Sequence, residues 1–159
     1  MAIERVREYF RTYKMEERIL EFAVSSATVE LAAQAVGVEG KRIAKTLSFW
    51  VGEKPILIVA AGDAKIDNAK YKAKFHAKAK MIGHDEVEAV IGHGVGGVCP
   101  FGIKEGIDVY LDISMRRFET VFPACGSSNS AIELNMQELE TYANSLEWID
   151  VCKDWQEEK

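Results

Sequence analysis

A glycine-rich stretch in the second half of the chain places the strongest restriction on the fold. Residues 92–102 read Gly-His-Gly-Val-Gly-Gly-Val-Cys-Pro-Phe-Gly, with five glycines and one proline among eleven residues. Glycine adopts positive φ readily and lets a ligand approach the backbone, whereas proline fixes φ and has no N–H to donate. The stretch can form neither a regular helix nor a central strand. It predicts a shaped loop, which either connects two strands tightly or presents backbone groups to a ligand.

The composition is that of an ordinary globular protein. The chain has 159 residues, of which 48% are hydrophobic and 28% are charged, and we expect one domain over residues 1–159. No apolar run approaches the about 20 residues that span a bilayer, and residues 2–8 have the charged amphipathic pattern of a helix instead of a signal peptide. Three cysteines without CxxC spacing predict neither a disulfide framework nor a zinc site. We expect a cytoplasmic protein without cofactor, metal or membrane partner.

Hydrophobic periodicity predicts strands in adjacent pairs, interrupted by helices at irregular intervals. This order favours an α+β fold with a mixed sheet over a doubly wound parallel sheet. Expected helices cover residues 2–14, 28–36, a lysine-rich segment from 67, 84–90 and 135–145; expected strands cover 19–24, 43–51, 55–61, 109–113, 131–134 and 148–152.

Three short motifs follow one another along the chain. They are Lys45-Thr46-Leu47 at the start of a predicted strand, Gly96-x-x-x-Pro100 continuing into Phe101-Gly102, and Ala124-Cys125-Gly126 before the strand at 131–134. In this order and spacing they resemble the YbaK/ProX family of aminoacyl-tRNA deacylases, free-standing relatives of the editing insertion domain in bacterial prolyl-tRNA synthetases. The resemblance covers about residues 25–151. It implies a curved mixed sheet or partial barrel flanked by helices, and a trans-editing hydrolase that cleaves the ester of mischarged aminoacyl-tRNA.

The resemblance assigns the family's lysine to Lys45 and its catalytic loop to Gly96, Gly97 and Pro100. In a cleft, the Lys45 ammonium could bind a phosphate, a carbonyl oxygen or a ribose hydroxyl and stabilise developing negative charge; otherwise it projects into solvent. An aminoacyl ester is already activated, so its hydrolysis needs an oriented water and a stabilised oxyanion more than a strong nucleophile. A backbone loop and one lysine are adequate for that task.

Two groups of residues are candidates for substrate binding. Val98, Cys99 and Phe101 in the first loop would surround the aminoacyl group, and the little room that they leave predicts a small amino acid. Gly126, Ser127 and Ser128 in the second loop would bind the terminal adenosine or a phosphate; alternatively the hydroxyls only satisfy a turn. The family often has basic residues after this glycine, whereas this chain has serines.

Two other functions stay open at this point. Cys99 follows His93 by six residues, so the two could form the Cys–His pair of a small cysteine hydrolase, or Cys99 could simply pack under the loop. The chain could also be a non-catalytic module of the same fold that binds tRNA or a synthetase.

Basic residues gather in one segment of a chain whose net charge is −5. Residues 64–80 contain six lysines and one acid, Asp67, and Lys70, Lys74 and Lys78 recur every fourth residue, along one face of a helix. These three lysines, with Arg42 as a further candidate, could contact the aminoacylated acceptor end of tRNA, or they form a solvated surface. Asp112 could orient Lys45 or form a surface ion pair. The resemblance makes tRNA the expected partner and a synthetase a further candidate.

Overall fold

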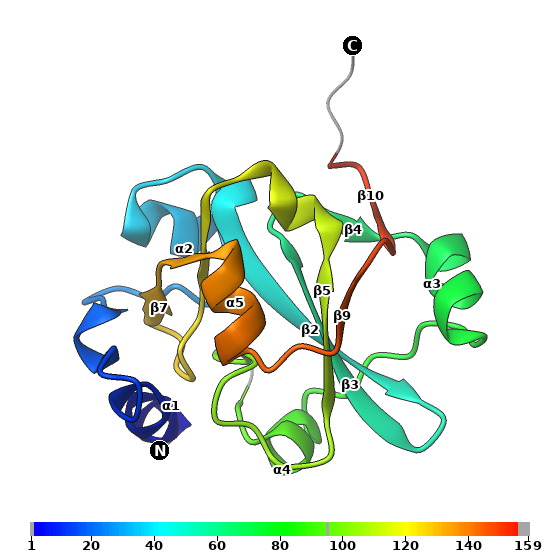
Figure 1. Ribbon diagram of the computed structural model, residues 1–159, viewed down its shortest axis with the longest axis horizontal. Helices are drawn as coiled ribbons and strands as arrows, with labels where there is room; N and C mark the ends of the chain where they lie inside the picture. The colour runs from blue at the N-terminus through cyan, green and yellow to red at the C-terminus, as the bar shows by residue number, and fades with distance from the viewer. Residues whose placement is uncertain (1, 95, 156–159) are drawn as a thin grey trace.

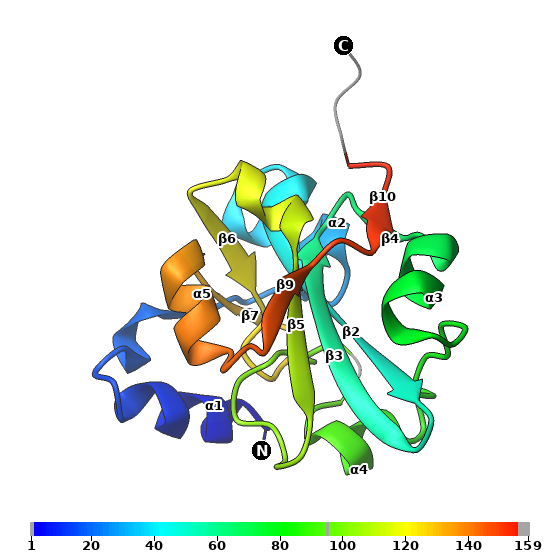
Figure 2. The same cartoon turned by 45° about the vertical axis from the view of Figure 1, so that its right-hand side comes forward.

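A six-stranded mixed sheet forms the centre of the computed structural model, which describes residues 2–94 and 96–155 (Figure 1). The strand order is β8-β6-β2-β3-β5-β9. The longest strands, β2 (Ile43–Val51) and β3 (Lys54–Ala61), form an antiparallel hairpin, as the sequence predicts. The other strands of the sheet are β5 (Asp108–Asp112), β6 (Thr120–Pro123), β8 (Leu134–Asn135) and β9 (Glu147–Ile149). The sheet curls, so that it resembles half of a barrel (Figure 2).

Two short antiparallel pairs attach distant segments to this sheet. β1 (Ile19–Glu21) pairs with β7 (Ser130–Ile132), which places the beginning of the chain beside the second predicted loop. β4 (Lys65–Ile66) pairs with β10 (Cys152–Lys153), which fixes the C-terminal segment beside the residues that follow β3.

Local capping signals place the helices around the sheet. The helices are α1 (Ala2–Arg11), α2 (Val29–Val36), α3 (Asn68–Phe75), α4 (Val87–Ile91) and α5 (Met136–Tyr142), with 3-10 turns η1 (Glu16–Arg18), η2 (Gly40–Arg42) and η3 (Ile113–Arg117). The Thr28 side chain accepts from the N–H of Leu31, and Gly37 ends α2 with φ of 88°. Asn135 forms a capping box with Glu138. These starts and stops confirm the predicted positions of α2 and α5.

The lysine-rich helix is shorter than its periodicity predicts. α3 ends at Phe75, because His76 takes the left-handed conformation with φ of 61°. Lys78 therefore lies beyond the helix, and the prediction that Lys70, Lys74 and Lys78 share one helical face is wrong.

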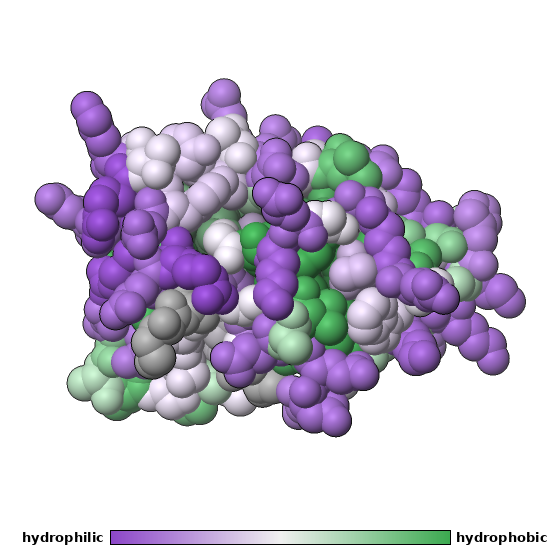
Figure 3. Space-filling view, turned by 90° about the horizontal axis from the view of Figure 1, so that it is seen from below, coloured by the Kyte–Doolittle hydropathy of each residue, from purple (hydrophilic) through white to green (hydrophobic). Residues whose placement is uncertain are grey.

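The hydrophobic core lies between the sheet and the helices. Residues 57–61 of β3 are completely buried, which is expected for a central strand that reads as a continuous apolar run. α1 adds Val6 and Phe10 to the same core, and the Phe10 ring meets that of Phe101 at 4.9 Å between centroids. On the face seen from below, hydrophobic surface occupies the middle and hydrophilic side chains surround it (Figure 3). Among residues 2–94 and 96–155, no helix combines the length and apolar character that crossing a membrane requires.

Candidate functional site

The two loops singled out by the sequence lie directly against each other. A Cβ atom placed on Gly97 would stand 2.7 Å from the carbonyl carbon of Gly126 and 2.7 Å from the nitrogen of Ser127. Only glycine fits at such a distance from another backbone. The glycine-rich loop therefore packs on the 124–130 loop, and both loops contribute to one site.

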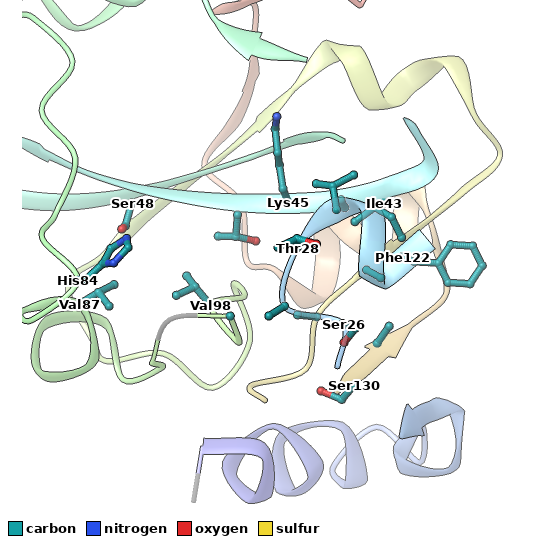
Figure 4. Close-up of a pocket in the computed structure, with 18 of the residues that line it drawn as sticks. Ser26, Thr28, Ile43, Lys45, Ser48, His84, Val87, Val98, Phe122 and Ser130 are labelled. Carbon is teal, nitrogen blue, oxygen red and sulfur yellow. The ribbon is translucent and has the colours of Figure 1, made fainter. Parts of the chain in front are cut away.

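A cavity of about 210 Å³ opens beside these loops (Figure 4). Its walls come from the N-terminal end of α2, from β2, from the segment before α4 and from the two loops. Three predicted site residues border it: Lys45, Gly96 and Val98. Sequence reasoning missed several polar contributors, namely Ser26, Thr28, Thr46, Ser48, His84 and Ser130. The predicted N-cap was the available signal for Thr28, and the alternation of β2 was the available signal for Thr46 and Ser48.

One face of β2 forms the floor of the cavity. Ala44, Thr46 and Ser48 all border it, because alternate residues of a strand point to the same side. The Thr46 hydroxyl is buried and has no hydrogen-bond partner among the described residues. Leaving a buried polar group unpaired costs about 1–3 kcal/mol, so this hydroxyl is an unfavourable feature of the protein alone.

Lys45 lies on the other side of the strand, and its ammonium points away from the other labelled side chains (Figure 4). Its Nζ donates to the carbonyl oxygen of Gly62 at 3.3 Å and to that of Ala64. Burial lowers the pKa of this ammonium from its usual value. An ammonium has three N–H donors, so one is left beside the two carbonyl oxygens, on the side of β2 away from the cavity.

The Asp112 carboxylate binds backbone N–H groups and does not orient Lys45. It is buried and accepts from the backbone N–H groups of Ser114 at 2.9 Å and Val151 at 3.0 Å. The two predicted roles, orienting Lys45 and forming a surface ion pair, are both wrong, because this side chain caps η3 and fixes the backbone near the C-terminus.

Three further residues of the glycine-rich loop do not border the 210 Å³ cavity and face the interior of the protein instead. Phe101 is completely buried between Tyr9 and Phe10, and Cys99 is completely buried as well. Pro100 borders a second cavity, on the side of α1 and α5. These three residues therefore support the loop from within, whereas Gly96 and Val98 face the first cavity. Val95, which belongs to the glycine-rich stretch, lies outside the described residues.

The Cys99 sulfur lies 3.5 Å from Nε2 of His93, so the suspected pair exists in space. However, Nε2 is also 2.6 Å from the carbonyl oxygen of Phe101. A carbonyl only accepts, so Nε2 carries the proton and cannot take one from the thiol. Burial lowers the pKa of His93 and raises that of Cys99 to about 12. These features argue against a thiolate nucleophile and against the cysteine-hydrolase hypothesis.

The serines of the second loop satisfy a turn. The Ser127 hydroxyl donates to Oδ1 of Asn129 at 2.9 Å and lies 2.8 Å from the hydroxyl of Ser130. Gly126 has φ of 93°, and Ser128 is exposed beside it. The backbone carbonyl of Ser128 accepts from the N–H of Ser26, which ties this loop to the start of α2.

Three of the four candidate RNA-binding residues already have partners within the protein. Arg42 donates to Thr120 and lies over the Phe122 ring at 5.2 Å. Lys70 pairs with Asp150 at 3.0 Å and Lys74 with Glu147 at 2.6 Å. Lys78 is exposed. None of these four basic residues borders the 210 Å³ cavity, and the described part of the chain holds no cluster of three or more His, Cys, Asp or Glu suited to a metal ion.

Comparisons with known proteins agree with one another. Residues 24–142 match the family described as aminoacyl-tRNA editing domain. The uncharacterized protein YwhH of Bacillus subtilis is 55% identical over 98% of this chain and 100% of its own length. EbsC of Enterococcus faecalis, named as a candidate Cys-tRNA(Pro)/Cys-tRNA(Cys) deacylase, is 32% identical over 77% of each chain. The proline–tRNA ligase of Shouchella clausii is 30% identical over 65% of this chain, which corresponds to 18% of the ligase.

A solved structure described as a candidate trans-editing enzyme for prolyl-tRNA synthetase superposes with a TM-score of 0.85. It is 25% identical and covers 96% of this chain and 97% of its own. The match confirms the curved mixed sheet flanked by helices. The matched family region contains Lys45 and both loops, and it excludes α1 and the segment that follows α5.

Proposed function

This chain belongs to the aminoacyl-tRNA editing domain family, whose activity is deacylation, and we propose that it edits tRNA mischarged with a small amino acid. The observation that carries the proposal is the cavity of about 210 Å³ between the N-terminal end of α2 and the glycine-rich loop. Pockets for drug-sized ligands hold about 300–1,000 Å³, so this one suits a short aminoacyl group.

In the proposed mechanism, water attacks the ester carbonyl and the protein supplies position and charge. Thr28 and Val29 at the start of α2 border the cavity, where the helix dipole is positive and favours a developing oxyanion. The backbone at Gly96 holds the aminoacyl group from the opposite side. Thr46 offers its unpaired hydroxyl to a polar group of the substrate. The remaining N–H of Lys45, on the other side of β2, is assigned a ribose or phosphate oxygen of the terminal adenosine outside the cavity.

The apolar walls set the size limit. Val87 and Val98 border the cavity and exclude a large side chain sterically. Such a pocket separates side chains that differ by one methylene by only about 1–3 kcal/mol, so alanine, serine and cysteine esters should overlap as substrates. EbsC is named for cysteine esters, which belong to this size class.

We propose the acceptor end of tRNA as the partner, with the cytoplasm as the compartment where charged tRNA is found. The similarity to proline–tRNA ligases makes a synthetase the second candidate partner. The alternative is that the chain binds tRNA without hydrolysing the ester.

A competition assay tests the proposal. tRNAs charged with alanine, serine, cysteine, proline and phenylalanine are offered together, and hydrolysis of each ester is followed. We expect turnover of several small esters and none of the phenylalanine ester. Lys45→Ala should lower the rate by about 100-fold or more while the melting temperature stays near that of the parent, since loss of one stabilising donor has an effect of that size.

Lys54→Ala is the matched control, because Lys54 is an exposed lysine in the neighbouring strand β3 and does not border the cavity. Preferential hydrolysis of the phenylalanine ester would contradict the small pocket. A folded Lys45→Ala protein with normal turnover would contradict the role of the lysine, and no turnover of any ester would favour the binding module.

A further inference from the structure

Lys45 is held in place by residues far from the cavity. We propose that Arg117, together with Asp63 and the C-terminal segment 152–155, forms a clamp on the turn at residues 62–64 and so positions the Lys45 ammonium. Arg117 is then a positioning residue for the reaction. This inference rests on the function proposed above for Lys45.

The first step is the turn itself, because it supplies both oxygens that bind Lys45. These are the carbonyl oxygens of Gly62 and Ala64, and the N–H of Ala64 bonds to the carbonyl of Ala61 at 3.0 Å. A Cβ atom on Gly62 would overlap the carbonyl oxygen of Gly40, so the turn is pressed against η2. The direction of a flexible four-carbon side chain thus depends on where this short turn lies.

The second step is the grip of Arg117 on the middle residue of the turn. Its guanidinium forms two parallel bonds with the carboxylate of Asp63, of 2.6 Å to Oδ1 and 3.0 Å to Oδ2. Bidentate pairs of this kind fix geometry as well as charge. The remaining donors bind the carbonyl oxygens of Ser114 and Trp155, both at 2.8 Å. Arg117 therefore connects η3, the turn and the C-terminal segment.

The third step is the C-terminal segment, which completes the clamp. The Arg117 guanidinium lies 5.1 Å from the centre of the Trp155 ring and 4.7 Å from that of Phe118. The Trp155 indole donates to the carbonyl of Cys152 at 3.3 Å, and β10 pairs with β4 directly after the turn. The turn is thus held at Asp63 and at residues 65–66. These C-terminal residues lie beyond the matched family region, which ends at residue 142.

The negative charge of Asp63 also acts on Lys45, because it favours the protonated ammonium. Burial lowers the pKa of Lys45, and the nearby carboxylate of Asp63 opposes that lowering. The pair with Arg117 keeps this carboxylate beside the turn, so it both orients the ammonium and favours its protonated form.

Three variants and one matched control test the clamp. Arg117→Gln and Asp63→Asn break the bidentate pair, and Arg117→Lys keeps the charge without the fork. Arg116→Gln is the control, because Arg116 is adjacent on η3 and also stacks on a tryptophan, Trp148 at 4.7 Å, without a bond to the turn. The first readout is the rate at which an amine-reactive ester modifies Lys45, relative to the exposed Lys80, by peptide mass spectrometry. The second is the pH profile of deacylation.

In Arg117→Gln and Asp63→Asn, we expect modification of Lys45 to rise and kcat to fall, each by about tenfold, the factor for one lost charge-assisted hydrogen bond. Asp63→Asn should also move the alkaline decline of the pH profile to lower pH, because the carboxylate no longer favours the ammonium. Arg117→Lys should recover part of the rate, and Arg116→Gln should match the parent in both readouts.

Unchanged Lys45 modification and an unchanged pH profile in folded variants would overturn the clamp. Should Arg117→Gln fail to fold, Asp63→Asn replaces oxygen by nitrogen at nearly the same volume and gives the same readouts. Increased modification with normal deacylation would support the clamp and would instead overturn the catalytic role of Lys45.

Discussion

Cys99 and Lys45 are both withdrawn from solvent, and burial affects their chemistry differently. The Cys99 thiol lies among apolar groups, where burial raises its pKa to about 12, so it stays neutral. Burial lowers the pKa of Lys45, but two carbonyl oxygens still accept from its ammonium. Of the two residues, Lys45 alone has a partner set that suits a charged group. For this reason, we expect water to be the attacking group.

Cys99→Ser should therefore keep most of the deacylase activity. A serine hydroxyl fits where the thiol lies and can donate to the carbonyl of Phe101, as the thiol does at 3.7 Å. We expect kcat/KM within about threefold of the parent, a small difference in transition-state free energy. Complete loss of activity, together with an acyl group trapped on Cys99 of the parent, would instead support the cysteine hydrolase.

At the scale of elements, α3 and the strands beside it determine what the lysines can do. Lys70 and Lys74 pair with acids near β9, so binding a phosphate requires each to exchange one anionic partner for another. Exposed ion pairs contribute only about 0–1 kcal/mol to stability, so breaking them costs little binding free energy when a tRNA phosphate replaces the carboxylate. Lys78 lies beyond the end of α3, so it does not belong to the helical face that carries Lys70 and Lys74.

We predict that replacing Lys70, Lys74 and Lys78 with glutamine weakens tRNA binding and flattens its dependence on salt. Each lost phosphate contact lowers the slope of log K against log salt by about 0.7–0.9. The affinity is measured across a salt series, with Lys14→Gln as the control, because Lys14 follows α1 on the side of the molecule away from α3 (Figure 1). An unchanged slope would assign the three lysines to solubility and to their ion pairs.

The elements that the sequence predicted well are those whose signals are local. Thr28 and Gly37 bound α2, and Asn135 starts α5, because each cap involves residues within one turn of the helix. The end of α3 was missed, since the lysine pattern continues through His76 although the backbone does not. β6 was missed as well; it has four residues including a proline and depends on pairing with β2 and β8.

The candidate site also contains residues that the sequence identified and residues that only long-range contacts place there. Lys45 and the two loops were identified by motifs that resemble a family, whereas the contact between the loops is seen only in the structure. Ser26 reaches the cavity through a bond to Ser128, 102 residues away, and no local pattern reports such a contact. The clamp around Arg117 is equally non-local, because it joins Asp63 to Trp155.

For the whole molecule, the buried His93 links folding to pH. Burial lowers its pKa below the usual 6.5, so in acid the unfolded chain binds a proton that the folded protein does not. Above pH 6.5 His93 is neutral in both states and does not reduce the free energy of unfolding. Between pH 6.5 and the lowered pKa of the folded state, the free energy of unfolding decreases as the pH falls. The loss is about 1.4 kcal/mol for each pH unit within this window.

His93→Gln should remove this part of the pH dependence, because glutamine does not titrate. The free energy of unfolding is measured by urea denaturation from pH 7.5 down to about pH 5 for both proteins. We expect the parent to lose more stability below pH 6.5 than the variant, and the two slopes to be parallel above it. Equal slopes throughout would show that His93 titrates alike in the folded and unfolded chains.

The cavity wall is drawn from five separate stretches of chain, within residues 26–32, 43–48, 81–87, 96–98 and 122–131. A ribosome must therefore release residues up to about 131 before the complete cavity can form. No single loop, grafted onto another scaffold, carries the site. The similarity to the much longer proline–tRNA ligase extends over 104 residues, so it involves a large part of the domain and not a single loop.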